Sequence, residues 1–152
     1  MVSAMQEIPK PLLVYVVEDS PIIRRLLAST IEAAGGELVG HSANALAAIA
    51  DLGVLQPDLI LIDISLDSGS GFDVLRALQE QKMGQSAIKV VLTNHANAEY
   101  ENLSLKLGAD SFFDKSSETS QVLALISALA AEKRRRGGNP RNPDHPGNHS
   151  RN

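Results

Sequence analysis

The sequence predicts an α/β fold, a doubly wound sheet of five parallel strands that alternate with five helices. Strand-like runs begin at Leu12, Leu59 and Ile88. The first has no polar alternation, which is typical of a strand buried inside a parallel sheet. The segments between them carry apolar residues at helical spacing, and strict alternation of strands and helices favours a parallel sheet with crossover helices. The chain has no internal repeat.

The first predicted strand covers residues 12–17, and a helix follows it. Ser20 is a suitable N-cap, and Pro21 fits the first helical position, where its missing N–H has no helical partner. Gly35, followed by a second glycine, ends the helix. Six residues at helical spacing are predicted to form its inward face: Ile22, Ile23, Leu26, Leu27, Thr30 and Ile31.

A weaker strand and an alanine-rich helix come next. Residues 37–41 are predicted to form a short strand at the edge of the sheet. Residues 44–52 are predicted to form a helix that Gly53 closes, with Leu46 and Ile49 directed inward.

The middle of the chain contains the third strand and the third helix. Pro57 and Asp58 turn the chain into a strand at residues 59–62. Ser70, with Asp73 three residues later, resembles a capping box and opens a helix that runs to about Lys82. The buried side of this helix is predicted to contain Phe72, Leu75 and Leu78.

The last third of the chain contributes two strands and two helices. Strands are predicted at residues 88–92 and 110–113, separated by a helix over residues 97–107 that Gly108 stops. The final helix runs from Ser117 to about Arg135, with an inward face of Val122, Leu125, Ile126 and Leu129.

Charged and hydroxyl side chains stand where the predicted strands end. Glu18 and Asp19 follow the first strand, Asp63 follows the third, Thr93 the fourth and Lys115 the fifth. Parallel strands bring their carboxyl ends to one edge of a sheet, where open α/β folds bind ligands. Clustered carboxylates repel one another unless a cation joins them, and hard oxygen ligands suit Mg²⁺. The pattern therefore predicts a pocket in which a phosphoryl group is placed on a carboxylate.

These residues resemble the response-regulator receiver domain of two-component signalling, the chemotaxis-regulator-like fold, over about Leu12 to Ala131. The motifs that carry the resemblance are Val-Val-Glu18-Asp19-Ser, Leu-Ile-Asp63, Val-Leu-Thr93 and Gly-Ala-Asp-Ser-Phe112-Phe-Asp-Lys115. The resemblance implies a flavodoxin-like sheet with the strand order 2-1-3-4-5.

The resemblance also implies roles for the acidic residues. Asp63 would accept a phosphoryl group from a phosphohistidine of a sensor histidine kinase or phosphotransfer protein. Asp19 and Asp63 would bind Mg²⁺ directly and Glu18 through water, and the backbone carbonyl of Ser65 would be a further ligand. Without the resemblance, Asp63 can simply begin a turn, and Glu18 and Asp19 can interact with the dipole of the following helix.

A switch is implied by three further residues. Lys115 would pair with Asp63 and then with the phosphoryl group, while the hydroxyl of Thr93 moves inward and the ring of Phe112 turns in after it. The surface of the fourth helix, fifth strand and fifth helix would then change, to be read by a downstream protein or used for homodimerisation. The alternatives are a solvated lysine, a strand threonine and a core phenylalanine.

The sequence departs from the family pattern near the site. Ser116 stands where proline usually follows the lysine, and a non-proline cis bond costs about 2.5–4 kcal/mol. Whether this peptide is cis, as in the family, is therefore left open by the sequence. Asp67 replaces a frequent proline, and Asn94 is bulkier than the usual small residue. Ser65 and His95 occupy positions that adjust the lifetime of the phosphoryl group in the family, and Asn94 lies beside them.

Length and composition limit the remaining possibilities. The 152 residues allow one domain with tails, which we expect as a flexible arm at 1–11, a receiver domain at 12–136 and a disordered basic tail at 137–152. The absence of cysteine excludes thiolate zinc sites and cysteine nucleophiles. Residues 1–132 carry a net charge of −9 and residues 133–152 one of +5, which argues against nucleic acid as a partner of the body.

The predicted location is the cytoplasm. The N-terminus has no signal-peptide pattern, and no apolar run approaches the ~20 residues of a membrane helix. The basic run Lys133–Arg136 is interpreted as a helix end and tail in solvent, with contact to an acidic partner or nucleic acid as the alternative. No motif of a zinc site, a hydrolase triad or a phosphate-binding nucleotide loop is present.

Three functions remain open. The first is a single-domain response regulator, not an enzyme beyond its own phosphorylation and dephosphorylation, which signals through protein contacts because the chain after Arg136 has no room for a DNA-binding domain. The second is a degenerate receiver that binds a partner without phosphorylation, an alternative that Asn94 and Ser116 leave open. The third is a small aspartyl-phosphate enzyme, for which a chain of this length hardly provides a substrate pocket.

Overall fold

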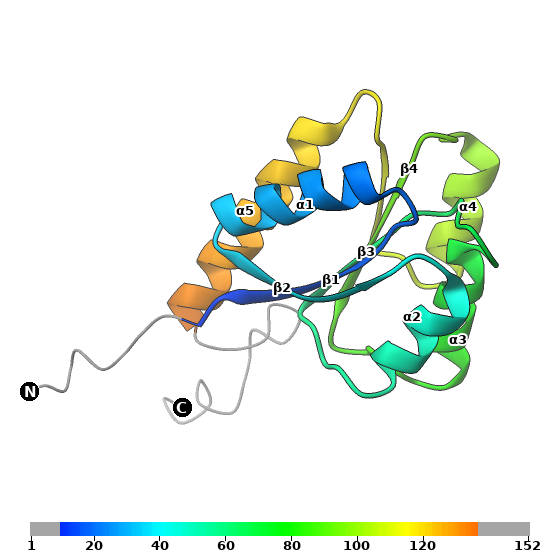
Figure 1. Cartoon of the computed structure of the whole chain (residues 1–152), viewed down its shortest axis with the longest axis horizontal. Helices are drawn as coiled ribbons and strands as arrows, with labels where there is room; N and C mark the ends of the chain where they lie inside the picture. Colours follow the sequence, from blue (N-terminus) through cyan, green and yellow to red (C-terminus); the bar gives the residue numbers. More distant parts are fainter. Residues whose placement is uncertain (1–9, 137–152) are drawn as a thin grey trace, which may run out of the picture.

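The computed structural model describes residues 10–136 and confirms the doubly wound α/β fold (Figure 1). One sheet contains five parallel strands in the flavodoxin-like order β2-β1-β3-β4-β5. The elements are, in chain order, β1 (Leu12–Val17), α1 (Pro21–Ala33), β2 (Gly36–Ser42), α2 (Ala45–Leu52), β3 (Leu59–Ile62), α3 (Gly71–Glu80), β4 (Ile88–Thr93), α4 (Ala98–Lys106), β5 (Ser111–Asp114) and α5 (Thr119–Arg136). The expected tail at 137–152 lies outside the described residues, as does the expected arm apart from the exposed Lys10 and Pro11.

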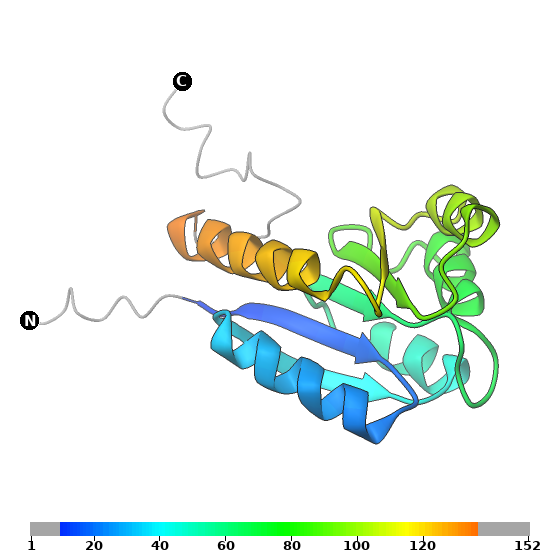
Figure 2. The ribbon, with the colours of Figure 1, turned by 90° about the horizontal axis from the view of Figure 1, so that it is seen from above.

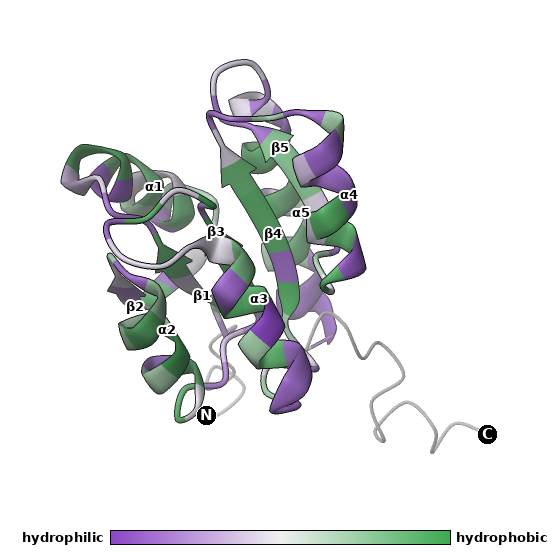
Figure 3. Ribbon diagram, turned by 90° about the vertical axis from the view of Figure 1, so that its right-hand side faces the viewer, coloured by the Kyte–Doolittle hydropathy of each residue, from purple (hydrophilic) through white to green (hydrophobic). Residues whose placement is uncertain are grey.

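Two apolar layers cover the two faces of the sheet. Successive side chains of a strand point to opposite faces, so Leu12, Val14 and Val16 pack with α1 and α5, whereas Tyr15 and Val17 pack with α2 and α3. Figure 1 shows α1 and α5 above the strands and α2 and α3 below them, and in Figure 2, which is seen from above, α1 and α5 lie in front of the sheet. Figure 3 shows β4 as largely hydrophobic, with broad hydrophilic segments on α3 and α4 and a mostly hydrophobic α2. The core is thus aliphatic, as the composition predicts.

The buried Tyr15 links β1 to α2. Its phenol donates a hydrogen bond of 2.6 Å to Asp51 Oδ2, and burial raises the pKa of Tyr15. Gly40 lies opposite on β2, where a Cβ atom would come within 2.9 Å of the Tyr15 ring. A residue larger than glycine at position 40 would therefore clash with the Tyr15 ring.

The predicted starts of α1, α2, α3 and α4 are confirmed by their caps, whereas α5 begins two residues after the predicted Ser117. Ser20 Oγ accepts from Ile23 N, and Ser70 with Asp73 forms the capping box of α3. The side chains of Asn44 and Asn97 cap α2 and α4 in the same way. The first turns of these four helices are accordingly fixed by local sequence.

The predicted inward faces of α1 and α2 are partly wrong. Ile22 and Leu26 are 67% and 60% exposed, because the buried stripe of α1 is centred on Ile31 and its neighbours one turn before. Leu46 is 80% exposed, and the small residues Ala45 and Ala48 face the core instead. Apolar spacing predicts a buried stripe but not its width, which depends on how many elements cover the helix.

Lys133 corrects the interpretation of the basic run. It is 7% exposed and donates to Asp58 Oδ2 at 2.5 Å. The same carboxylate oxygen accepts from Leu13 N at 2.8 Å. The end of α5 is therefore attached to the amino-terminal ends of β1 and β3, whereas Arg134, Arg135 and Arg136 are exposed.

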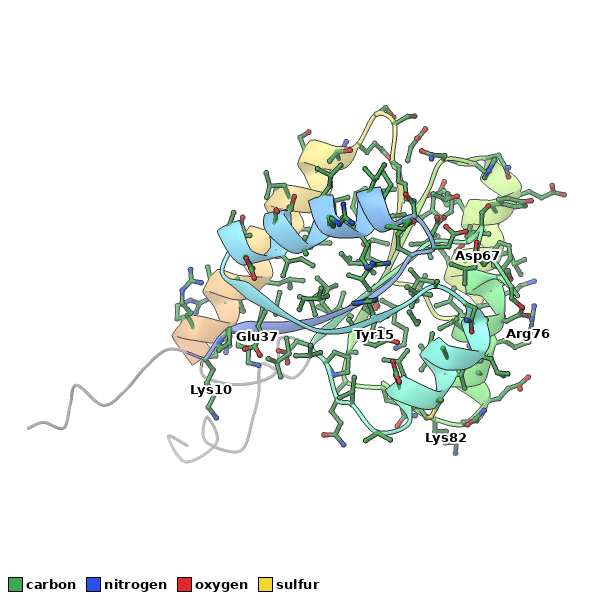
Figure 4. The ribbon with its side chains drawn as sticks, in the orientation of Figure 1. Lys10, Tyr15, Glu37, Asp67, Arg76 and Lys82 are labelled. Atoms are coloured by element: carbon green, nitrogen blue, oxygen red, sulfur yellow. The ribbon has the colours of Figure 1, made fainter. Side chains whose placement is uncertain are left out.

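Helix α3 ends at Glu80, two residues earlier than predicted. Lys82 has a φ of 54°, and bonds from Lys82 N to Gln79 O and from Met83 N to Leu78 O close a Schellman motif. Figure 4 labels Lys82 at the lower edge of the view, below Asp67. A non-glycine residue thus occupies a position that favours glycine.

In the part of the chain that the structure describes, no helix has both the length and the apolar character to span a membrane.

We predict that Lys82→Gly raises the free energy of unfolding by about 0.5–1 kcal/mol, because the relief at positive φ exceeds the backbone entropy that glycine loses on folding. Urea denaturation measures this change. The control Glu80→Gly, inside the last turn of the same helix, should lower it by a similar amount. Equal destabilisation by both substitutions would contradict the assignment of strain to Lys82.

Candidate functional site

The strand-end residues converge at the carboxyl edge of the sheet. Strand β1 pairs with β3, β3 with β4 and β4 with β5, all in parallel. Glu18 therefore follows β1 at the same edge at which Asp63 follows β3 and Lys115 follows β5. Backbone bonds fix these ends, since Asp63 N donates to Val17 O and Lys115 N donates to Thr93 O, each at 2.9 Å.

Three carboxylates form one cluster at this edge. Glu18, Asp19 and Asp63 each offer an oxygen, and these atoms lie within 4.8 Å of one another. Glu18 is 2% and Asp63 7% exposed, while Asp19 is half-buried. A buried set of hard oxygen ligands fits a divalent cation such as Mg²⁺. The arrangement that the sequence predicts for these three residues is thus present.

Lys115 lies between two of these carboxylates. Its Nζ donates to Glu18 Oε1 at 2.5 Å and to Asp63 Oδ2 at 2.9 Å. Burial opposes the charge of the ammonium, but the hydrogen bonds from it to the two carboxylates outweigh burial and raise the pKa of Lys115. The side chain is therefore a permanent cation within the cluster at neutral pH.

The same surroundings favour the charged form of Lys115 but disfavour the charged form of Glu18. Burial raises the pKa of Glu18 above its usual value of 4.5, and the hydrogen bonds from Lys115 and Ser20 only partly offset this effect. Ser20 N donates to Glu18 Oε2 at 3.0 Å. The ionised carboxylate is thus held in place at a net cost in free energy.

The other oxygen of Asp63 faces the loop before α3. Asp63 Oδ1 accepts from Ser65 N at 3.3 Å, and Ser65 pairs with Ser70 across the loop. Gly71 lets the chain pass close by, because a Cβ atom there would come within 2.4 Å of Asp63 O. The role of the Ser65 carbonyl as a metal ligand stays a prediction.

Thr93 lies deeper than the carboxylates, whereas Phe112 is less buried than Glu18 and Asp63. Thr93 is fully buried, and its Oγ1 accepts from His95 N at 3.1 Å. Phe112 is half-buried and packs against the core layer of α2 and α3. The ring thus has the position of a core residue in this conformation, and its role in a switch stays a prediction.

The rim of the site is polar and exposed. Asn94 and His95 are exposed in the loop between β4 and α4. Asp67 is exposed in the loop between β3 and α3, and Figure 4 shows it at the end of the molecule opposite Lys10. None of the peptide bonds among the described residues is cis, so the Lys115–Ser116 bond is trans.

Sequence reasoning missed the residues that hold the loop after β5. Asp114, Ser116 and Thr119 surround Lys115 with hydrogen bonds from side chains. The signal that could have found them is the spacing of Asp114 and Ser116, which is that of an Asx turn.

Comparison with known proteins places the chain in a defined group. Residues 14–127 match the family described as the response regulator receiver domain. The transcriptional regulatory protein FixJ of Azorhizobium caulinodans is 28% identical over 130 residues, which are 85% of this chain and 60% of that protein. A protein-glutamate methylesterase/protein-glutamine glutaminase of Nitrobacter winogradskyi is 31% identical over 137 residues, which cover 83% of this chain and 32% of the enzyme.

Solved structures agree with the fold. A CheY-like receiver domain protein from Methanospirillum hungatei has a TM-score of 0.71 at 23% identity and covers 85% of this chain and all of its own. A response regulator from Burkholderia pseudomallei has a TM-score of 0.67 at 25% identity and covers 79% of this chain and 69% of its own. The Burkholderia structure contains a phosphorylated aspartic acid, a calcium ion and citrate.

We predict that Glu18→Gln stabilises the metal-free protein at neutral pH by about 1 kcal/mol, within the range of a typical stabilising substitution. Because the pKa of Glu18 is raised on folding, its contribution to stability is fully present below pH 4.5 and is lost as the pH rises through the raised pKa. Glutamine, which does not ionise, removes that loss.

The measurement is urea denaturation at pH 4 and pH 7, with chelator and with Mg²⁺. The gain should shrink toward pH 4, and Mg²⁺ should stabilise the variant less than the wild type. The exposed Glu37→Gln is the control. A variant that is less stable than wild type at pH 7 in chelator would contradict the prediction.

Proposed function

Since this chain belongs to the response regulator receiver domain family, we propose that it accepts a phosphoryl group on Asp63 from the phosphohistidine of a sensor histidine kinase or phosphotransfer protein. The observation that carries the proposal is the contact of Lys115 Nζ with Asp63 Oδ2, at 2.9 Å, inside a cluster of three carboxylates. A buried carboxylate held by a cation is ready to act as a nucleophile toward phosphorus.

The reaction is a transfer between two nucleophiles. A carboxylate oxygen of Asp63 attacks the phosphorus, the P–N bond to the imidazole breaks, and the imidazole leaves with the electron pair of that bond. Lys115 offsets the charge that accumulates on the phosphoryl oxygens. Mg²⁺, held by Glu18, Asp19, Asp63 and the carbonyl of Ser65, would supply further charge stabilisation and in-line orientation.

The signal then passes through Thr93 and Phe112. The Thr93 hydroxyl turns from the His95 backbone, to which it is bonded here, toward a phosphoryl oxygen, and the Phe112 ring fills the space behind it. The surface of α4, β5 and α5 changes, and a downstream protein or a second copy of the chain reads it. A bias of a few kcal/mol is enough for such a two-state change.

An apolar groove supports a protein as the phosphoryl donor. It runs between α1 and α5, is lined by residues that include Leu26, Leu27 and Val122, and reaches Lys115. Ile22 and Leu26 leave apolar surface exposed beside it. A donor domain seated there would have its phosphohistidine close to Asp63.

The chain spans 60% of FixJ and 32% of the methylesterase, so the activities of those whole proteins do not transfer to it. We propose that the domain catalyses only its own phosphorylation and dephosphorylation, works in the cytoplasm and signals through proteins. The degenerate receiver remains the second candidate, because Asn94 and Ser116 depart from the family pattern.

We predict that the protein, incubated with Mg²⁺ and acetyl phosphate, gains one phosphoryl group that mass spectrometry assigns to Asp63. Chelation of Mg²⁺ should slow the reaction by about a hundredfold, because a bound cation contributes several kcal/mol of charge stabilisation. Asp63→Asn should gain no phosphoryl group, while the control Glu37→Gln, at an exposed position of β2 opposite Leu13, reacts as wild type does. If the wild type accepts no phosphoryl group from acetyl phosphate or from a panel of kinases, the degenerate receiver is the correct reading.

In this proposal Ser65, Asn94 and His95 set the lifetime of the phosphoryl group on Asp63. His95→Ala is expected to speed phosphate release about fivefold, equivalent to about 1 kcal/mol, because an exposed ring no longer limits the approach of water. Exchanges at Ser65 and Asn94 are expected to shift the same rate. Release is followed after removal of the donor, with Gln85→Ala, an exposed residue in the α3–β4 loop, as control. Unchanged release in all three rim variants would refute the idea.

A further inference from the structure

The backbone of Lys115 is fixed on both sides. Its N–H donates to Thr93 O at 2.9 Å, which continues the pairing of β5 with β4. Its carbonyl oxygen accepts from Thr119 Oγ1 at 2.8 Å. The first bond belongs to the sheet, whereas the second comes from a side chain at the first residue of α5.

Asp114 fixes the chain immediately before and after Lys115. Its Oδ1 accepts from Ser116 N at 2.8 Å and from Ser116 Oγ at 2.6 Å. Its own N–H donates to Glu118 Oε1 at 2.8 Å, and its carbonyl accepts from Glu118 N at 2.8 Å. The loop between β5 and α5 is thus closed by hydrogen bonds at the place where the family resemblance leads us to expect a rigid proline.

These hydrogen bonds hold the backbone of Lys115, whereas α5 is held mainly by other contacts. The helix is held by burial of Val122, Ile126 and Ala130 and by the Lys133–Asp58 pair at its far end. Lysine has a long flexible stem, so the direction of its ammonium depends on how firmly its backbone is held. The hydrogen bonds from Ser116 lower the pKa of Asp114, and its carboxylate is therefore an ionised acceptor at neutral pH.

We propose that Asp114 and Thr119 are positioning residues for the phosphoryl-transfer reaction, because they fix the backbone around Lys115 and so direct its Nζ to Asp63. The inference rests on the proposed function, since its consequence for rate exists only if Asp63 accepts a phosphoryl group. It extends the site to two residues that touch neither the metal ligands nor the phosphoryl group.

The experiment compares two matched pairs of variants. Asp114→Ala removes the acceptor and Asp114→Asn keeps an oxygen at the same place. Thr119→Val removes the hydroxyl donor at nearly constant shape and Thr119→Ser keeps it. With saturating Mg²⁺, the Ala and Val variants should lower the maximal rate of phosphorylation by acetyl phosphate about fivefold at an unchanged half-saturating concentration. The Asn and Ser variants should stay within about twofold of wild type.

A second measurement needs no phosphorylation. In metal-free protein, the ¹⁵N–¹H signal of the Lys115 ammonium, assigned by its loss in Lys115→Met, reports the bonds to Glu18 and Asp63. It should persist in wild type, Asp114→Asn and Thr119→Ser, and weaken through faster exchange in Asp114→Ala and Thr119→Val.

The outcomes separate the two proposals. If the wild type is not phosphorylated, the proposed function fails and the ammonium signal alone decides whether the two residues position Lys115. If the wild type reacts and all four variants match it, or each pair is equally slow, the positioning role is overturned. Urea denaturation identifies a variant that does not fold. If a variant at Asp114 or Thr119 does not fold, the pair at the other residue decides the test.

Discussion

The ammonium of Lys115 is the interaction on which the site depends. Three carboxylate oxygens lie within 4.8 Å of one another at the carboxyl edge of the sheet, and Glu18 and Asp63 are nearly removed from water. Such a group is stable only if a cation offsets its repulsion. Lys115 does so with bonds of 2.5 and 2.9 Å, and it reaches this place because β5 lies two strands away from β3 in the same parallel sheet.

This arrangement lowers the stability of the fold at Glu18 and restricts which residue can stand at position 71. Burial raises the pKa of Glu18 even beside a lysine, so the carboxylate is less favourable folded than in water. Position 71 leaves no room for a side chain, because α3 begins against the backbone of Asp63. Functional sites commonly hold destabilising groups that the rest of the fold supports. Here the support is the aliphatic core on both faces of the sheet.

Helix α5 is held differently at its two ends. Its last turn is attached to β1 and β3 through Lys133 and Asp58, both buried. Its first turn follows a loop closed by Asp114, Glu118 and Thr119, which are half-buried or exposed. Hydrogen bonds near solvent open more easily than buried ion pairs. The first turn of α5 therefore depends on bonds nearer to solvent than those that hold its last turn.

The sequence alone determined the elements, their order and the residues at the strand ends. Apolar runs mark β1, β3 and β4, and Ser20, Asn44, Ser70 and Asn97 mark helix starts, because strands and caps depend on local periodicity and local hydrogen bonds. The convergence of Asp63 with Glu18 and Lys115 followed from parallel topology, since every strand ends at one edge.

The tertiary structure decided which side chains are covered. Ile22, Leu26 and Leu46 fit an apolar stripe yet lie exposed, while Lys133 fits a solvated helix end yet is buried. Burial depends on how many neighbours pack around a helix, and the partner of Lys133 is 75 residues away in the chain. The hydrogen bond from Lys115 Nζ to Glu18 Oε1 was likewise decided by the fold, because 97 residues separate the two in the chain.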